Sequence, residues 1–266
     1  GDELTAFVDP RGEEFDMDYL ETIKMKRQMA LPYSSYKLAW LVVYGFIVLA
    51  QLISVALHLP RVTAVAGWLL APLLSVWVWR ARGPKLLVLV LVLFWTGDVL
   101  GNPKLLGIGP IGLFLSVAAY AGANAILFAL FFQYGALAGW RTIFGEHQHW
   151  QVGVAVLCFI AVAAGLMLAW SNFNPILRVA ASIYLLLLIL TVTAALAMDV
   201  RAGVGSVLLL NSHLLVLLEV AGRLIGTATL YRLLVLALYG FGILLIAIGV
   251  VTVGRLPQKN PKNTSL

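Results

Sequence analysis

Eight long apolar runs alternate with short polar breaks along the chain. The runs lie at about residues 38–58, 62–80, 85–101, 110–133, 151–170, 176–198, 203–222 and 230–253. The breaks carry charge, Gly or Pro, as in "HLPR", "RARGPK" and "SNFNP". A helix needs about 20 mainly apolar residues to cross roughly 30 Å of hydrocarbon. The pattern therefore predicts eight transmembrane helices, because the runs lack the strict alternation of a lipid-facing β-strand.

Composition supports the same fold class. Hydrophobic residues make up 62% of the chain and charged residues 11%, whereas about a quarter of the residues of an ordinary soluble domain are charged. We expect an all-α, polytopic integral membrane protein of the cell (inner or plasma) membrane. Its parts are an N-terminal cytoplasmic segment 1–37, an eight-helix transmembrane domain 38–253 and a cytoplasmic tail 254–266.

Lys and Arg are divided unequally between the two sides that eight spans create. The side with both termini carries thirteen of the eighteen, and the opposite side carries five, which are Arg61, Lys104, Arg178, Arg223 and Arg232. Because cytoplasmic loops collect Lys and Arg, both termini are expected in the cytoplasm. The formal charge of +6 follows from this topology and requires no nucleic-acid partner.

Residues 12–29, "GEEFDMDYLETIKMKRQM", predict a short amphipathic helix before the first span. Its acidic residues come first and its basic residues last, which matches the helix macrodipole. Phe15, Tyr19 and Ile23 recur at a spacing of four and form one apolar stripe. Two interpretations remain open, a juxtamembrane helix on the bilayer surface and a docking helix for a partner protein.

Only four acidic residues follow residue 37, namely Asp98, Glu146, Asp199 and Glu219. Glu146 and Asp199 fall in predicted cytoplasmic loops or helix ends, whereas Asp98 and Glu219 fall inside apolar runs. An ionisable group at membrane depth is costly and indicates a functional site. Spans three and seven run in the same direction, so the two carboxyl groups are expected at similar depth in the outer half. Such a pair can share one proton, as a general acid and base require.

Structural alternatives exist for each of these positions. Asp98 can satisfy backbone groups at "LGNP", and Glu219 can form a salt bridge with Arg223 at the i, i+4 spacing. Further polar residues at membrane depth are Asn211 and His213 in span seven, and Tyr120 and Asn124 one turn apart in span four. They either line a cavity or form hydrogen bonds between helices. Cys158 is the single cysteine, and neither a metal nor a cofactor is expected.

The segments "LLAPLLSVWVW" and "LVLFWTGDVL", joined by a short basic loop, resemble the YhhN/lysoplasmalogenase family of eight-span membrane proteins. That family places Gly-Asp at the end of its third span, which corresponds to Gly97 and Asp98. Its seventh span carries a pattern like G-A-L-L-F-L-L-S-D, and this chain has "GSVLLLNSH" from Gly205 to His213 in the same register. His213 therefore stands at the position of the family's second Asp.

The resemblance implies a hydrolase that cleaves the vinyl-ether bond of lysoplasmalogens, releasing a fatty aldehyde and a glycerophospho-headgroup. A carboxylic acid in an apolar site can protonate the vinyl-ether carbon, and a neutral imidazole can take a proton from water. The expected catalytic residues are Asp98, His213 and Glu219, converging on one cavity. The expected substrate-binding residues are Tyr120, Asn124, Asn211 and Arg223. A non-catalytic membrane partner with the same fold and a small proton-coupled lipid or solute carrier remain alternatives.

Overall fold

The computed structural model describes residues 35–102, 106–109, 111–145, 149–224 and 226–254. The chain divides into two compact units, residues 1–39 and 40–266, and the helices around the candidate site belong to the second. The amphipathic helix expected at 12–29 and the tail after residue 254 lie outside the described residues.

Nine α-helices and no strand occur in the described part of the chain. They are α2 (Ser35–Ala56), α3 (Pro60–Arg80), α4 (Lys85–Leu100), α6 (Ile111–Gln133), α7 (Ala136–Gly145), α8 (Trp150–Trp170), α9 (Pro175–Met198), α10 (Val200–Val220) and α11 (Ala228–Gly254). The all-α prediction is confirmed, and each of the eight apolar runs forms one helix. The short helix α7 was not predicted.

Seven of the described helices are long and apolar enough to cross a membrane. The remaining long helix, α4, has 16 residues and is shorter than the roughly 20 that a full crossing needs. The predicted polytopic character is confirmed at this level.

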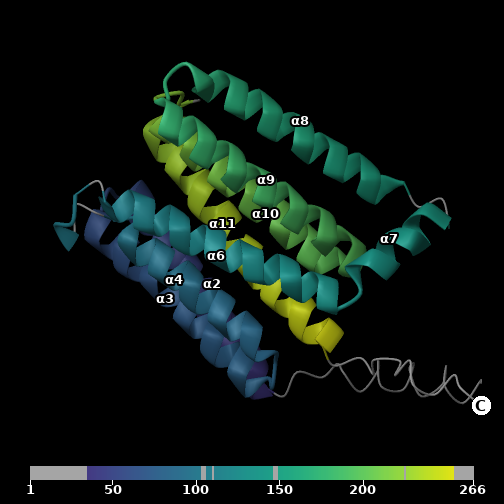
Figure 1. The fold of residues 1–266 in the computed structure, drawn as a ribbon. Helices are drawn as coiled ribbons and strands as arrows, with labels where there is room; N and C mark the ends of the chain where they lie inside the picture. Colours follow the sequence, from purple (N-terminus) through teal and green to yellow (C-terminus); the bar gives the residue numbers. More distant parts are fainter. Residues whose placement is uncertain (1–34, 103–105, 110, 146–148, 225, 255–266) are drawn as a thin grey trace, which may run out of the picture. The chain divides into compact units, whose positions relative to one another are not determined.

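The long helices lie side by side with their axes roughly aligned (Figure 1). The closely packed neighbours are α10 with α11, α4 with α6, α9 with α10 and α3 with α4, while α6 also packs against α9. Helix α8 packs against α9 and α10. In this arrangement α4, α6, α9, α10 and α11 can each contribute a side chain to one region.

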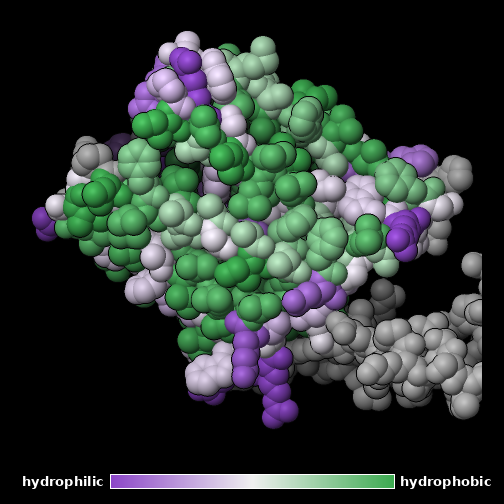
Figure 2. All heavy atoms as spheres, in the orientation of Figure 1, coloured by the Kyte–Doolittle hydropathy of each residue, from purple (hydrophilic) through white to green (hydrophobic). Residues whose placement is uncertain are grey.

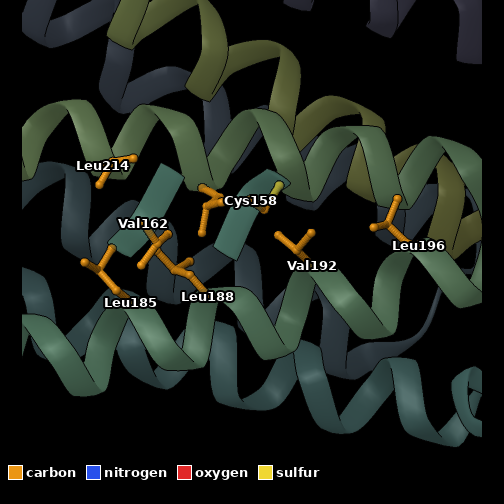
Figure 3. Close-up of a cluster of buried hydrophobic side chains, with 8 residues drawn as sticks. Cys158, Val162, Leu185, Leu188, Val192, Leu196 and Leu214 are labelled. Carbon is orange, nitrogen blue, oxygen red and sulfur yellow. The ribbon is translucent and has the colours of Figure 1, made fainter. Parts of the chain in front are cut away.

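A buried apolar cluster joins α8, α9 and α10 (Figure 3). Its members include Cys158 and Val162 from α8, Leu185 and Leu188 from α9, and Leu214 from α10. Cys158 is buried there as a small apolar side chain, with its thiol unpaired.

Small residues bring α10 and α11 into close contact. A Cβ atom added at Gly205 would lie 2.6 Å from the carbonyl oxygen of Gly242, and one added at Gly242 would lie 3.0 Å from the carbonyl oxygen of Gly205. Lipid tails are as apolar as Leu, so close backbone approach rather than the hydrophobic effect stabilises helix pairs in a bilayer. The two glycines therefore hold α11 close to α10, and the candidate site depends on that closeness.

The outer surface of the helices is apolar. Hydrophobic residues cover most of the face seen in Figure 2, and hydrophilic residues gather at its borders. Met167 on α8 is 78% exposed and Leu157 on the same helix is 66% exposed. Monomeric soluble proteins rarely expose contiguous apolar patches larger than a few hundred Å², so this surface is that of a membrane protein.

Asp199 has a structural role at a helix end, as its predicted position outside the apolar runs suggests. One of its carboxylate oxygens accepts hydrogen bonds from the backbone N–H groups of Arg201, at 2.9 Å, and of Ala202, at 3.2 Å. Asp199 is thus the N-cap of α10, a position where a carboxylate satisfies free N–H donors. Asp98 and Glu219 are then the acidic residues of the described apolar runs that remain as candidates for a functional site.

Candidate functional site

Asp98 lies in the last turn of α4, and two tyrosine hydroxyls donate hydrogen bonds to its carboxylate. Tyr120 on α6 donates to one oxygen at 2.5 Å, and Tyr239 on α11 donates to the other at 2.8 Å. Bonds from a hydroxyl to an ionised oxygen are short and strong. No described Lys or Arg forms an ion pair with Asp98. The two tyrosines therefore replace the water that this carboxylate would otherwise bind.

The backbone of the last turn of α4 is held by three side chains. The indole N–H of Trp68 and the side-chain amide of Asn102 both donate to the carbonyl oxygen of Asp98, at 3.3 and 3.1 Å. The hydroxyl of Ser116 donates to the carbonyl oxygen of Gly97 at 2.7 Å. The carbonyl of Asp98 lies at the helix end, where helical partners are missing, whereas the carbonyl of Gly97 also accepts from the N–H of Gly101 at 2.8 Å. The bonds hold the backbone from which the Asp98 side chain projects.

Gly97 lets the ring of Tyr120 reach Asp98. A Cβ atom at this position would lie 2.7–2.9 Å from three carbon atoms of the Tyr120 ring, well inside van der Waals contact. The Gly-Asp pair of the sequence thus has a physical explanation, because the glycine makes room for the tyrosine that binds the aspartate.

His213 on α10 belongs to the same group of side chains. Its Nδ1 atom and the hydroxyl of Tyr184 on α9 are hydrogen-bonded at 2.5 Å. The His213 ring lies 4.9 Å from the Tyr120 ring and 6.1 Å from the Tyr239 ring, centroid to centroid. The two tyrosines that bind Asp98 therefore also contact His213. Hereafter Asp98, Tyr120, Tyr184, His213 and Tyr239 are called the Asp98 cluster.

The aromatic rings of this region pack directly against one another. The centroids of Phe94, Tyr120 and Tyr239 are 6.1–6.4 Å apart, within the range of contacting aromatic pairs. The three rings are therefore in mutual contact. Asp98 and His213 are both half-buried, so each side chain retains some accessibility.

The imidazole of His213 keeps one nitrogen available. Nδ1 is bonded to Tyr184, and no described residue forms a hydrogen bond with Nε2. A neutral imidazole is a donor at one nitrogen and an acceptor at the other. Nε2 is therefore the atom that can bind a water or a substrate group next to Asp98.

Two of the expected substrate-binding residues, Asn124 and Asn211, use their side-chain amides for hydrogen bonds within their own helices. Asn124 is fully buried; its amide donates to the carbonyl oxygen of Tyr120 at 2.9 Å, and its side-chain oxygen has no partner. The Thr191 hydroxyl of α9 approaches the Asn124 carbonyl oxygen at 3.4 Å. Asn211 donates to the carbonyl oxygen of Val207 in its own helix at 2.8 Å. Asn124 is thus bonded to the backbone of a cluster residue, whereas no hydrogen bond joins the described Asn211 side chain to the cluster.

Glu219 and Arg223 are not brought into the Asp98 cluster, and the expected convergence of three ionisable groups is corrected to two. Both side chains are exposed, and they form no ion pair with each other within the described structure. Glu219 follows His213 by six residues, which is about 9 Å along the helix and roughly 240° around it. It therefore points away from the face of α10 that carries His213. Arg223 lies beyond the end of α10, after Gly222 with φ of 70°.

Tyr184 and Tyr239 are site residues that the sequence reasoning missed. Both lie in apolar runs, where a tyrosine counts as a hydrophobic residue although its hydroxyl needs a partner when buried. Their depth was the available signal: each lies near the middle of its helix, as does Tyr120. Among the described residues, no group of three or more His, Cys, Asp or Glu side chains is arranged to hold a metal ion.

Comparison of the chain with protein-family models, with curated proteins and with solved structures gives no match. The resemblance to the YhhN/lysoplasmalogenase family therefore rests on the sequence segments around Asp98 and His213 alone.

Proposed function

We propose that the chain is an eight-span protein of the cell membrane with both termini in the cytoplasm. Helix α4 is the third span in this proposal, and the residues next to it in the chain complete the crossing of the membrane. Support comes from the alternation of eight long helices with short connections and from the excess of Lys and Arg on the side that holds the termini. The segment 12–29 would then lie at the cytoplasmic surface, where a partner protein can bind it.

We further propose that this protein is a lipid hydrolase of the lysoplasmalogenase type. The observation that carries the proposal is the pairing of Asp98 with two tyrosine hydroxyls directly beside His213. A carboxyl group and an imidazole with a free nitrogen are the acid and base that vinyl-ether hydrolysis needs. The apolar surroundings suit a substrate whose reacting bond adjoins a fatty chain.

In the proposed reaction the Asp98 carboxyl group transfers its proton to the outer carbon of the vinyl ether, and the carbon attached to oxygen becomes an oxocarbenium ion. His213 takes one proton from a water bound at Nε2, and the oxygen of that water bonds to the cation. The resulting hemiacetal then breaks its bond to the glycerol oxygen, which takes the proton held by His213, while the hemiacetal hydroxyl gives its proton to the Asp98 carboxylate. The products are a fatty aldehyde and the glycerophospho-headgroup, and both residues return to their starting states. Tyr120 and Tyr239 hold Asp98 in place and stabilise its ionised form after proton transfer.

The test is aldehyde release from a lysoplasmalogen by the purified protein. Asp98→Asn retains the size of the side chain but cannot deliver a proton, and losing a general acid costs on the order of 10²–10⁴-fold in rate. Thr96→Val is the matched control, because Thr96 lies on the same helix and its hydroxyl bonds only to the carbonyl oxygen of Val92 in α4.

A second variant separates the enzyme from a non-catalytic relative. His213→Asp restores the residue that the family carries at this position. Activity in the wild type that Asp98→Asn abolishes and Thr96→Val retains supports the hydrolase. Activity that appears only in His213→Asp would indicate a protein that has kept the fold and lost the reaction. Absence of aldehyde from both proteins, with choline and ethanolamine headgroups alike, would refute the proposal.

A further inference from the structure

A groove of about 400 Å³ lies between α2 and α3, away from the Asp98 cluster. Its walls are apolar and include Ile47 and Ala50 from α2 and Val62, Val65 and Leu69 from α3. The one charged residue in its lining is Arg61. The groove therefore combines a long apolar wall with a single cationic end.

Arg61 is the second residue of α3, and its side chain is exposed. No carboxylate among the described residues forms an ion pair with it. The N-terminus of α3 has no side-chain cap, and its first residue, Pro60, has no N–H. The N–H groups of Arg61 and Val62 add the partial positive charge of the helix end at the same place. A guanidinium group binds a phosphate through two parallel hydrogen bonds. The mouth of the groove is thus complementary to a phosphate-bearing anion.

The length of the groove matches the depth of one leaflet. Eight residues separate Arg61 from Leu69, which is about 12 Å along the helix, and half of a bilayer core is about 15 Å. An acyl chain that begins at Arg61 and follows the groove would reach close to the centre of the membrane.

We propose that this groove binds an anionic phospholipid, with its phosphate on Arg61 and one acyl chain between α2 and α3. The proposal rests on the membrane location of the helices and is independent of any chemistry at Asp98. A second groove, of similar volume, provides an internal comparison. It lies between α7, α8 and α9, and its lining, which includes Trp140, Val156 and Phe159, contains no charged residue. The second groove is therefore expected to show no preference for an anionic headgroup.

The experiment is native mass spectrometry of the purified full chain with phosphatidylglycerol or phosphatidylcholine of identical acyl chains. The wild type is expected to retain phosphatidylglycerol preferentially. Arg61→Ala is expected to lower that retention by about tenfold, the factor that corresponds to losing one hydrogen-bonded charge pair. Ala50→Trp fills the groove at an exposed position and is expected to lower the retention of phosphatidylglycerol to the same extent.

Two control variants distinguish this site from general surface effects. Arg232→Ala removes an exposed charge from the first turns of α11, on the same predicted side, and Val156→Trp fills the uncharged groove at an exposed position. Both are expected to retain phosphatidylglycerol as the wild type does. Equal retention of the two lipids by the wild type would overturn the proposal. So would unchanged retention in Arg61→Ala, or an equal loss in Arg232→Ala. Matching melting temperatures of all variants exclude unfolding as the cause of a loss.

Discussion

The hydrogen bond between Tyr239 and Asp98 gives the sharpest prediction about the stability of the site. Tyr239→Phe removes the donor and keeps the ring, which is 8% exposed and packed against Phe94 and Tyr120. The change therefore isolates one hydroxyl that binds a carboxylate oxygen at 2.8 Å. Asp98→Ala removes the other partner, and the two changes combined complete a double-mutant cycle.

The magnitude follows from the kind of bond. Hydrogen bonds between helices in a membrane average about 0.6 kcal/mol in such cycles, and bonds to charged groups contribute about 1.5–3 kcal/mol. Asp98 accepts bonds from two hydroxyls and pairs with no described cation, so each hydroxyl carries a large share of its stabilisation. We expect a coupling free energy of about 1–3 kcal/mol between positions 98 and 239.

Reversible unfolding of the detergent-solubilised protein measures this coupling. Tyr231→Phe is the matched control: Tyr231 lies on the same helix, and its hydroxyl donates to the carbonyl oxygen of Leu215 instead of to Asp98. Its cycle with Asp98→Ala should be additive within about 0.5 kcal/mol. Additivity of the same size between Tyr239→Phe and Asp98→Ala would refute the hydrogen-bonded arrangement of the site.

Two further predictions address the packing beneath the site and the topology. Gly97→Ala should lower the stability by about 1–3 kcal/mol through overpacking against Tyr120. Gly122→Ala should be close to neutral, because its added Cβ meets Leu93 at an ordinary 3.7 Å. Equal effects of the two changes on the melting temperature would contradict this explanation of the Gly-Asp pair. In sealed cells, Cys introduced at Arg61 should react with an impermeant thiol reagent and Cys introduced at Arg141 should not; reaction of both would exclude the proposed topology.

The helices could be predicted closely because each one is a property of a local segment. A bilayer requires every backbone hydrogen bond to be satisfied within the helix, so an apolar run of sufficient length defines its own helix. The run 176–198 became α9 from Pro175 to Met198, and the run 230–253 became α11 from Ala228 to Gly254. The short helix α7 has ten residues and an amphipathic sequence, and a search for long apolar runs does not detect such a helix.

The depth of the site residues in the membrane was predictable, but the direction in which each side chain points was predictable only in part. Counting residues along the spans placed Asp98 and Glu219 at similar depth, and His213 and Tyr120 were identified as polar residues within the membrane. The structure brings Asp98, His213 and Tyr120 together. The same count admitted Glu219, because depth along a helix does not fix the direction of a side chain around it. The place of Tyr239 in the site depends on which helices are neighbours. The close contact of Gly205 with Gly242 makes α10 and α11 neighbours. Contacts between distant segments of this kind are not encoded in a local pattern.

The most direct test of the central claim, that Asp98 protonates a vinyl-ether carbon, is hydrolysis of a lysoplasmalogen in D₂O. Mass spectrometry of aldehyde trapped at early times reports where the solvent proton is added. Proton transfer from Asp98 predicts one deuterium on the carbon next to the aldehyde group in the wild-type product, and no product above the uncatalysed background with Asp98→Asn. Product without deuterium at that carbon, or equal rates for wild type and Asp98→Asn, would contradict it.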